Sequence, residues 1–277
     1  MKIYFGDNQF LGVNHSQGKG GGYYAQYKTA ADIAITLRQA WAEGLTDFCF
    51  TVTPKTIAAI NLVIDDCPFD LHPALPYAQT TNALIAKSGL VGALKAKLPT
   101  TNYIQLTTAF LCALFGRYER VVKLIVLSEL KGIPLGKIKS VGLLNVATDL
   151  LLGIKRYDLL NCFDSVIRDD LKMETMFYTM NFPKLASIMW EQNSSSCALV
   201  FNINSDGFRT NPTLDEVITA IDYFGDNNSI GMSLFSGGEV SSVKKTLASV
   251  PNLKGVLFGS SKAINIKSNI ELIKNEE

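Results

Sequence analysis

Two turns in the last third of the chain have residue types that bind negatively charged groups. The first is Ser236-Gly237-Gly238; the second, Gly259-Ser260-Ser261-Lys262, follows an apolar strand and starts a helix. Glycine allows the backbone to approach a ligand closely, and the free amides at a helix start favour an anion. We therefore predict a phosphate site made of Ser236, Gly237, Gly238, Gly259, Ser260, Ser261 and Lys262. The alternative is that these glycines only form tight turns.

A second group, near the start of the chain, could transfer protons. Histidine titrates near neutral pH, so His15 is the natural candidate. Asp7 could orient His15 or act as the base itself. The predicted catalytic set is His15, Asp7, Asn145 and Tyr77, the last two at the ends of the fourth and third predicted strands. The alternative for His15 is a structural role, which we also expect for His72.

Polar residues collect where the predicted strands end, which is the catalytic face of a (β/α)8 barrel. An amide both donates and accepts hydrogen bonds, so it suits a polyhydroxylated ligand. The guanidinium of Arg209 is a further anion ligand. The predicted substrate-binding residues are Asn8, Gln9, Asn14, Thr51, Thr53, Gln79, Thr179, Asn181, Asn202, Asn204 and Arg209. The alternative is that they cap helices and bind neighbouring loops.

Metal and thiolate chemistry have little support in the sequence. One histidine and one aspartate near each other do not make a metal site, and we predict none. The five cysteines are scattered without a CxxC pair and indicate free thiols in a reducing compartment. A GxSxG nucleophile elbow is absent.

Strand and helix patterns alternate along the whole chain and predict one (β/α)8 TIM-barrel domain over residues 1–277. The long helical pattern at 107–131 indicates an inserted helix or helix pair in the third βα unit. A doubly wound sheet is the rival fold, but Gly6-Asp7-Asn8-Gln9 after the first strand is not GxGxxG. Predicted strands cover 2–5, 47–53, 70–77, 138–145, 173–180, 197–204 and 253–258, with another before Ser236. We expect residues 10–14 to extend the first strand and a helical segment at 148–171 to break near Tyr157.

The net charge and the distribution of apolar residues limit which partners the chain could bind. The formal net charge of +1 gives no electrostatic case for nucleic acid. The most apolar region, 103–130, is interrupted by Arg117, Glu119, Arg120 and Lys123, so we expect no transmembrane segment. Segment 107–131 could instead form a homo-oligomer contact. The chain enters a strand without a basic and apolar leader, which favours the cytoplasm.

The region 198–273 resembles aldo/keto reductase barrels, through the strand and turn Val256-Leu257-Phe258-Gly259-Ser260-Ser261. The resemblance implies that such turns hold the phosphates of NADPH. That family uses an Asp after strand two, a Tyr in the next helix, a Lys on strand three and a His on strand four. The corresponding ends here carry Thr51, Thr53 and Asn145, so the family's catalytic set does not carry over. The opening 5–15 also resembles uncharacterised bacterial barrels associated with surface-polysaccharide gene clusters.

Three functions follow as expectations. The leading one is an enzyme acting on a phosphorylated or nucleotide-linked small molecule, with a sugar of polysaccharide or other carbohydrate metabolism as the expected substrate. It would work by proton transfer of the isomerase or lyase type and would need no cofactor. The alternatives are an NADPH-dependent oxidoreductase with a non-standard catalytic set, and a non-catalytic barrel that binds a sugar or a protein.

Overall fold

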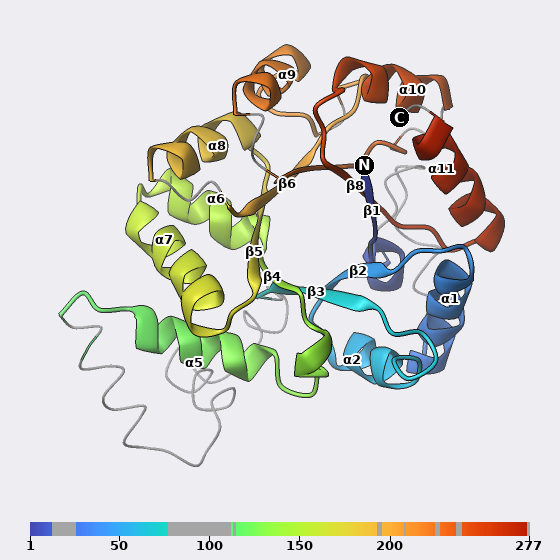
Figure 1. Cartoon of the computed structure of the whole chain (residues 1–277), viewed down its shortest axis with the longest axis horizontal. Helices are drawn as coiled ribbons and strands as arrows, with labels where there is room; N and C mark the ends of the chain where they lie inside the picture. The colour runs from blue at the N-terminus through green and yellow to red at the C-terminus, as the bar shows by residue number, and fades with distance from the viewer. Residues whose placement is uncertain are drawn as a thin grey trace.

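Eight parallel strands close into a barrel in chain order, with β8 pairing back to β1 (Figure 1). The computed structural model describes residues 1–12, 26–76, 112, 115–192, 196–207, 209–224, 228–236 and 240–275. The predicted (β/α)8 barrel is confirmed. The strands are β1 (Lys2–Phe5), β2 (Asp47–Thr51), β3 (Asp70–Leu75), β4 (Ser140–Leu143), β5 (Glu174–Thr179), β6 (Ala198–Asn202), β7 (Asn228–Met232) and β8 (Gly255–Phe258).

Helices surround the barrel and begin at residues that satisfy their first amides. Thr29 accepts from the Asp32 amide at the start of α1, and Thr213 accepts from the Glu216 amide at the start of α9. Among the described residues, no helix is long and apolar enough to cross a membrane. The α-helices are α1 (Ala30–Ala42), α2 (Pro54–Asn61), α5 (Glu119–Glu129), α6 (Asn145–Gly153), α7 (Tyr157–Ser165), α8 (Phe182–Glu191), α9 (Leu214–Tyr223), α10 (Val240–Ser249) and α11 (Ala263–Asn275).

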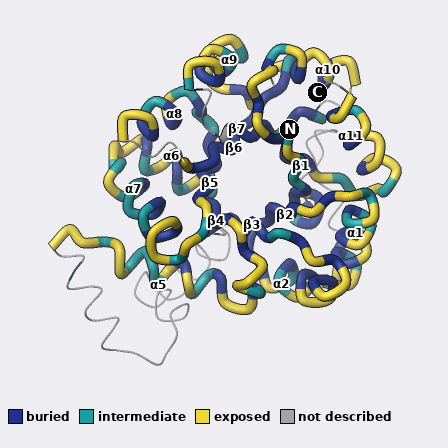
Figure 2. The backbone as a smooth tube through the Cα atoms, viewed as in Figure 1, coloured by how far each residue is buried: buried dark blue, intermediate teal, exposed yellow. Residues whose placement is uncertain are grey.

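Alternation along the strands produces two apolar cores, one on each face of the barrel wall. Outward residues such as Phe48, Phe177 and Phe201 pack under the helices. Inward residues fill the barrel itself, and Tyr178 and Cys49 belong to this inner cluster. Figure 2 shows the result as a ring of buried strands inside more exposed helices. Because both faces are buried, the strands are apolar runs with few polar interruptions.

The amino-terminal end of the barrel interior holds a chain of buried polar side chains. His72 Nε2 lies 2.9 Å from Asp47 Oδ1, and His72 Nδ1 lies 2.7 Å from Ser140 Oγ. Lys2 Nζ forms an ion pair with Asp47 Oδ1 at 2.8 Å. Burial works to raise the pKa of Asp47, but hydrogen bonds from His72 and Lys2 outweigh it and lower that pKa. His72 thus has a structural setting, at the end of the barrel opposite the strand carboxyl termini.

The chain after β1 differs from the prediction. Residues 8–11 form the 3₁₀ helix η1 (Asn8–Leu11) in place of an extended strand. The carbonyl of Asp7 accepts from the amides of Phe10 and Leu11, and Gly12 ends the turn with a φ of 74°. The strand continuation is therefore wrong over Phe10–Gly12, and residues 13–14 lie outside the described part of the chain.

The third βα unit is long, as predicted, and contains α5 before the 3₁₀ helix η2 (Leu135–Lys137) and β4. The predicted helix over 107–131 is observed as α5 at 119–129. Residue 112 is also helical, while 107–111 and 113–114 lie outside the described residues. The helical segment predicted at 148–171 is broken as expected, because α6 ends at 153 and α7 begins at 157.

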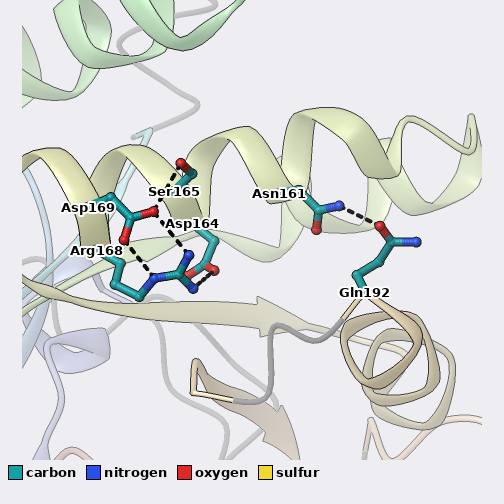
Figure 3. A network of polar contacts seen from close by, with 6 residues as sticks. All are labelled: Asn161, Asp164, Ser165, Arg168, Asp169 and Gln192. Carbon is teal, nitrogen blue, oxygen red and sulfur yellow. Dashed lines mark hydrogen bonds and ion pairs between the residues drawn. The ribbon is translucent and has the colours of Figure 1, made fainter.

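A polar network holds the end of α7 and the π-helical turn η3 (Val166–Asp170) that continues it (Figure 3). Arg168 bonds to Asp164 at 2.7 Å and to Asp169 at 3.0 Å. One turn earlier, Asn161 donates to Gln192 at 2.7 Å, which joins α7 to the residue after α8. The network lies on the outer layer of the barrel and stabilises the connection to β5.

Candidate active site

Asp7 directly follows the β1–Gly6 segment and is buried at the carboxyl end of the barrel, with 7% of its surface exposed. Its Oδ2 accepts from the Thr51 amide at 2.7 Å, and the Thr51 side chain also bonds to it. Burial raises the pKa of Asp7 to about 7, although both Thr51 interactions lower it. Both protonation states are therefore populated near neutral pH, as a general acid or base requires.

Tyr178 on β5 is the inward residue that sequence reasoning missed. Its ring lies across Gly142 on β4, where an added Cβ would be 2.7 Å from the Tyr178 Cε2. The side chains of Tyr178 and Cys49 are hydrogen-bonded, and both interact electrostatically with Asp7. Burial raises the pKa of both, so phenol and thiol stay protonated at neutral pH. The barrel interior thus brings three proton-bearing groups together from β2, β5 and the end of β1.

Gln9 joins the first and last strands at the same end of the barrel. Its Nε2 donates to the Gly6 carbonyl at 2.7 Å. Its buried Oε1 has no hydrogen-bond partner within the described part of the chain and lies against Gly259, where a side-chain carbon would collide with it. The absence of a side chain at Gly259 is therefore required by Gln9 and not only by a turn.

Asn202 is the inward residue at the end of β6. Its Oδ1 accepts from Ser233 Oγ at 2.5 Å, and its Nδ2 contacts the Met180 sulfur at 3.1 Å. Sulfur is a weak acceptor, so the amide N–H groups retain capacity for a ligand. Ser233 has a positive φ of 68°, which directs its hydroxyl to Asn202 at some backbone cost.

Four of the predicted substrate-binding residues have their side chains engaged by the fold. Thr53 and Asn181 cap α2 and α8, and Thr179 donates to Asp149 on α6 at 2.6 Å. The Asn204 amide donates to the carbonyls of Ser233, Leu234 and Ser236, each at 3.2 Å. These contacts correspond to the capping and loop-binding alternative, in which the four side chains stabilise the fold.

The two predicted phosphate turns differ in their surroundings. At α10, the Asp206 carboxylate accepts from Ser242 Oγ at 2.9 Å, so an acidic group already lies at the first turn. A second anion there would be repelled. At α11, Gly259 and Lys262 are exposed, and Ser260 and Ser261 are half-buried. The start of α11 is thus the open turn, with positive partial charge from the helix and a lysine beside it.

The remaining predicted residues have other positions. Asn8 and Arg209 are exposed, and Arg209 has a positive φ of 52°. Asn145 is not a strand residue but the first residue of α6, half-buried there. Ser236 is buried in the turn after β7. The predicted residues that lie outside the described part of the chain are His15, Asn14, Tyr77, Gln79, Gly237 and Gly238.

Within the described ranges, no three His, Cys, Asp or Glu side chains gather where they could hold a metal ion. All five cysteines are free. The described residues at the barrel mouth include carboxyl, amide and hydroxyl groups, which can bind oxygen atoms of an organic ligand.

No protein-family model matches the chain. No curated protein matches it in sequence either. The fold is similar to two structures described as a "putative aldo-keto reductase" from Pseudomonas aeruginosa, with TM-scores of 0.60 and 0.59 and 9% identity in each case. Both alignments cover 99% of this chain and 90% of the other.

A third similar structure is described as a "putative 2,5-diketo-D-gluconic acid reductase B". Its TM-score is 0.55 at 10% identity, covering 99% of this chain and 85% of the other. At this identity the likeness establishes the barrel fold alone. The expected resemblance to aldo/keto reductase barrels is confirmed at that level, while the resemblance of 5–15 to a second bacterial family stays a prediction.

Proposed function

We propose that this barrel is an NADPH-dependent oxidoreductase that reduces a small carbonyl compound and uses Asp7 as its proton donor. The observation that carries the proposal is the buried Asp7 carboxyl at the carboxyl end of the strands, with its pKa raised to about 7. An acid that is half-protonated at neutral pH is suited to protonate an oxygen during the reaction. Structures that share this fold are described as putative reductases, which motivates the choice of reaction, while the residues named here supply the argument for it.

The start of α11 fits a phosphate group of the cofactor. The turn combines an exposed glycine, two hydroxyl side chains, an exposed Lys262 and the first amides of a 13-residue helix. Ser260 Oγ accepts from the Lys262 amide and donates to the Lys262 carbonyl, both at the long distance of 3.4 Å, so these weak contacts could be exchanged for a phosphate. The start of α10 fits poorly, because Asp206 already occupies it.

The hydride for the carbonyl carbon would come from NADPH held at the start of α11. Asp7 gives its proton to the carbonyl oxygen and becomes a carboxylate. The Thr51 amide, 2.7 Å from Asp7 Oδ2, then stabilises the negative charge that remains. The Asn202 amide orients a further oxygen of the substrate.

Turnover of NADPH with a panel of aldehydes, ketones and diketones tests this proposal. We expect saturable quenching of intrinsic fluorescence by NADPH and loss of its absorbance with a subset of carbonyls. Asp7→Asn should lower kcat by about 10²- to 10⁴-fold. An unchanged kcat in that variant would remove Asp7 from the mechanism, and no NADPH binding at all would remove the cofactor.

The cofactor turn has its own matched pair of variants. Lys262→Glu reverses a charge at the start of α11, and Lys254→Glu reverses an exposed charge before β8. We expect the first to weaken NADPH binding by about 10- to 150-fold, since a charge-assisted contact to phosphate is worth about 1.5–3 kcal/mol. Equal effects of the two variants would contradict a phosphate site at α11.

A second candidate is a proton-transfer enzyme, an isomerase or lyase, acting on a phosphorylated sugar. The observation in its favour is that the positions of the reductase catalytic set carry Thr51, Thr53 and Asn145. Asp7 would then be the base, with no cofactor. Incorporation of solvent deuterium into phosphosugars, followed by NMR in the absence of NADPH, separates this candidate from the first.

A further inference from the structure

Tyr178 on β5 is held in the barrel interior by residues of β4 and β2. It alternates inward from β5 together with Met176, while Phe177 packs outward. A side chain on Gly142 would collide with its ring, so β4 leaves open the space that the ring crosses. The ring therefore points from β5 across β4 toward Cys49 on β2, and its direction is fixed by packing.

The hydroxyl at the end of this ring has a partner that forms only weak hydrogen bonds. The thiol of Cys49 is a weak donor and a weak acceptor. A hydroxyl bonded to a thiol can rotate to a stronger acceptor at small cost, and the S–H can then donate to the phenolic oxygen. Cys49 is 2% exposed and Tyr178 is 7% exposed, so bulk water has almost no access to the thiol and little access to the phenol.

Asp7 lies close enough to interact electrostatically with both residues. The described titratable groups that act on this pair are Asp7 and Tyr4, together with Asp47 and Lys2 from the amino-terminal end of the barrel. Thr51, whose amide donates to Asp7, follows Cys49 by two residues on β2, so alternation places both on the inward face below Asp7. The Tyr178 hydroxyl, bonded to Cys49, is thus a neutral donor on the same side of the barrel interior as Asp7.

We propose that Tyr178 is the second hydrogen-bond donor of the site and contacts the same substrate oxygen that Asp7 protonates. Cys49 and Gly142 are positioning residues that hold the Tyr178 hydroxyl and ring. This inference rests on the proposed function in naming a carbonyl oxygen as the acceptor. Two preorganised donors on one oxygen stabilise the charge that develops there during hydride transfer.

Tyr178→Phe tests the role of the hydroxyl, because it keeps the ring over Gly142. Removal of one such donor commonly lowers kcat by about 10²- to 10³-fold. We expect that loss with NADPH affinity unchanged. Tyr223→Phe, at an exposed tyrosine on α9, is the matched control and should leave kcat unchanged. Cys49→Ala keeps the hydroxyl and should lower kcat only a few-fold. A Tyr178→Phe enzyme with wild-type kcat would overturn the inference.

A second measurement does not depend on turnover. With tyrosine labelled by ¹³C at the ring carbon that bears oxygen, the Tyr178 resonance should show a titration step with the midpoint of Asp7. The step should disappear in Asp7→Asn. A wild-type Tyr178 resonance without this step would overturn the inference. If no carbonyl is reduced but the step is present, the oxidoreductase proposal fails and the pairing of Tyr178 with Asp7 stands.

Discussion

Replacing Asp7 with asparagine should change how the stability of the protein depends on pH. The pKa of Asp7 is about 7 in the folded protein, against an ordinary value of 3.8. The folded state therefore holds a proton that the unfolded chain has already lost between these values. Stability from this group is fully present below the ordinary value and is lost as the pH rises through about 7.

The size of the effect follows from the same two values. A difference of one pKa unit corresponds to about 1.4 kcal/mol, so the free energy of unfolding should fall by up to about 4 kcal/mol between about pH 4 and pH 9. Asparagine has nearly the same shape and can still accept from the Thr51 amide. It cannot ionise, so Asp7→Asn should match the wild type at low pH and exceed it at high pH.

Urea unfolding at about pH 5 and about pH 9 should show about 3 kcal/mol of this change, because about two of the roughly three pKa units lie above pH 5. For each protein, the free energy of unfolding at the higher pH is subtracted from that at the lower pH. The contribution of Asp7 is the amount by which this difference is larger in the wild type than in Asp7→Asn. Asp65→Asn, at an exposed carboxylate, serves as the control and should behave as wild type. If the wild type and Asp7→Asn lose the same stability over this range, Asp7 is not a buried carboxyl of raised pKa and the proposed proton donor is wrong.

Other consequences can be measured separately. Gly259→Ala would drive a methyl group into Gln9 Oε1 and should cost about 1–3 kcal/mol in chemical denaturation, partly relieved by Gln9→Ala in the same chain. Asp47→Asn should cost about 1–3 kcal/mol at neutral pH, because the buried His72 and the half-exposed Lys2 lose their carboxylate partner. Because the pKa of Asp47 is lowered in the folded protein, Asp47 stabilises the fold above its ordinary pKa, and this stability is lost at lower pH. The free energy of unfolding of Asp47→Asn should therefore fall less on acidification than that of the wild type. An equal fall in both proteins would contradict this. Ile125 and Leu127 on α5 are 36% and 40% exposed, and if 107–131 forms a homo-oligomer contact, changing both to serine should lower the mass measured by light scattering.

The sequence predicted the barrel because each strand is an apolar run followed by a helical period, and both signals are local. The same rule correctly placed Asp7 and Asn202 at the carboxyl ends of strands. Tyr178 and Cys49 were missed because they lie inside strands that are buried on both faces, where inward and outward residues look equally apolar. The inward alternation of Met176 and Tyr178 was the available signal.

The hydrogen-bond partners of the amide and hydroxyl side chains could not be predicted from neighbouring residues in the sequence. Asn204 bonds to a turn about 30 residues further along the chain, so its role depends on how β6 and β7 are placed side by side. Thr179 likewise bonds to Asp149 on a helix that precedes its own strand. For η1, the 3₁₀ turn depends on the Asp7 carbonyl and on Gly12, and the apolar pair Phe10-Leu11 resembles a strand equally well.

The contact between Gly142 and Tyr178 links two positions that are far apart in the sequence. Any larger residue at 142 would displace the phenol, so the two positions are expected to change together among homologous chains. A homologue with alanine or a larger residue in place of this glycine should have a small residue at 178, and its barrel would offer a different interior to the substrate. This pair of positions would then divide such barrels into two groups with separate chemistry.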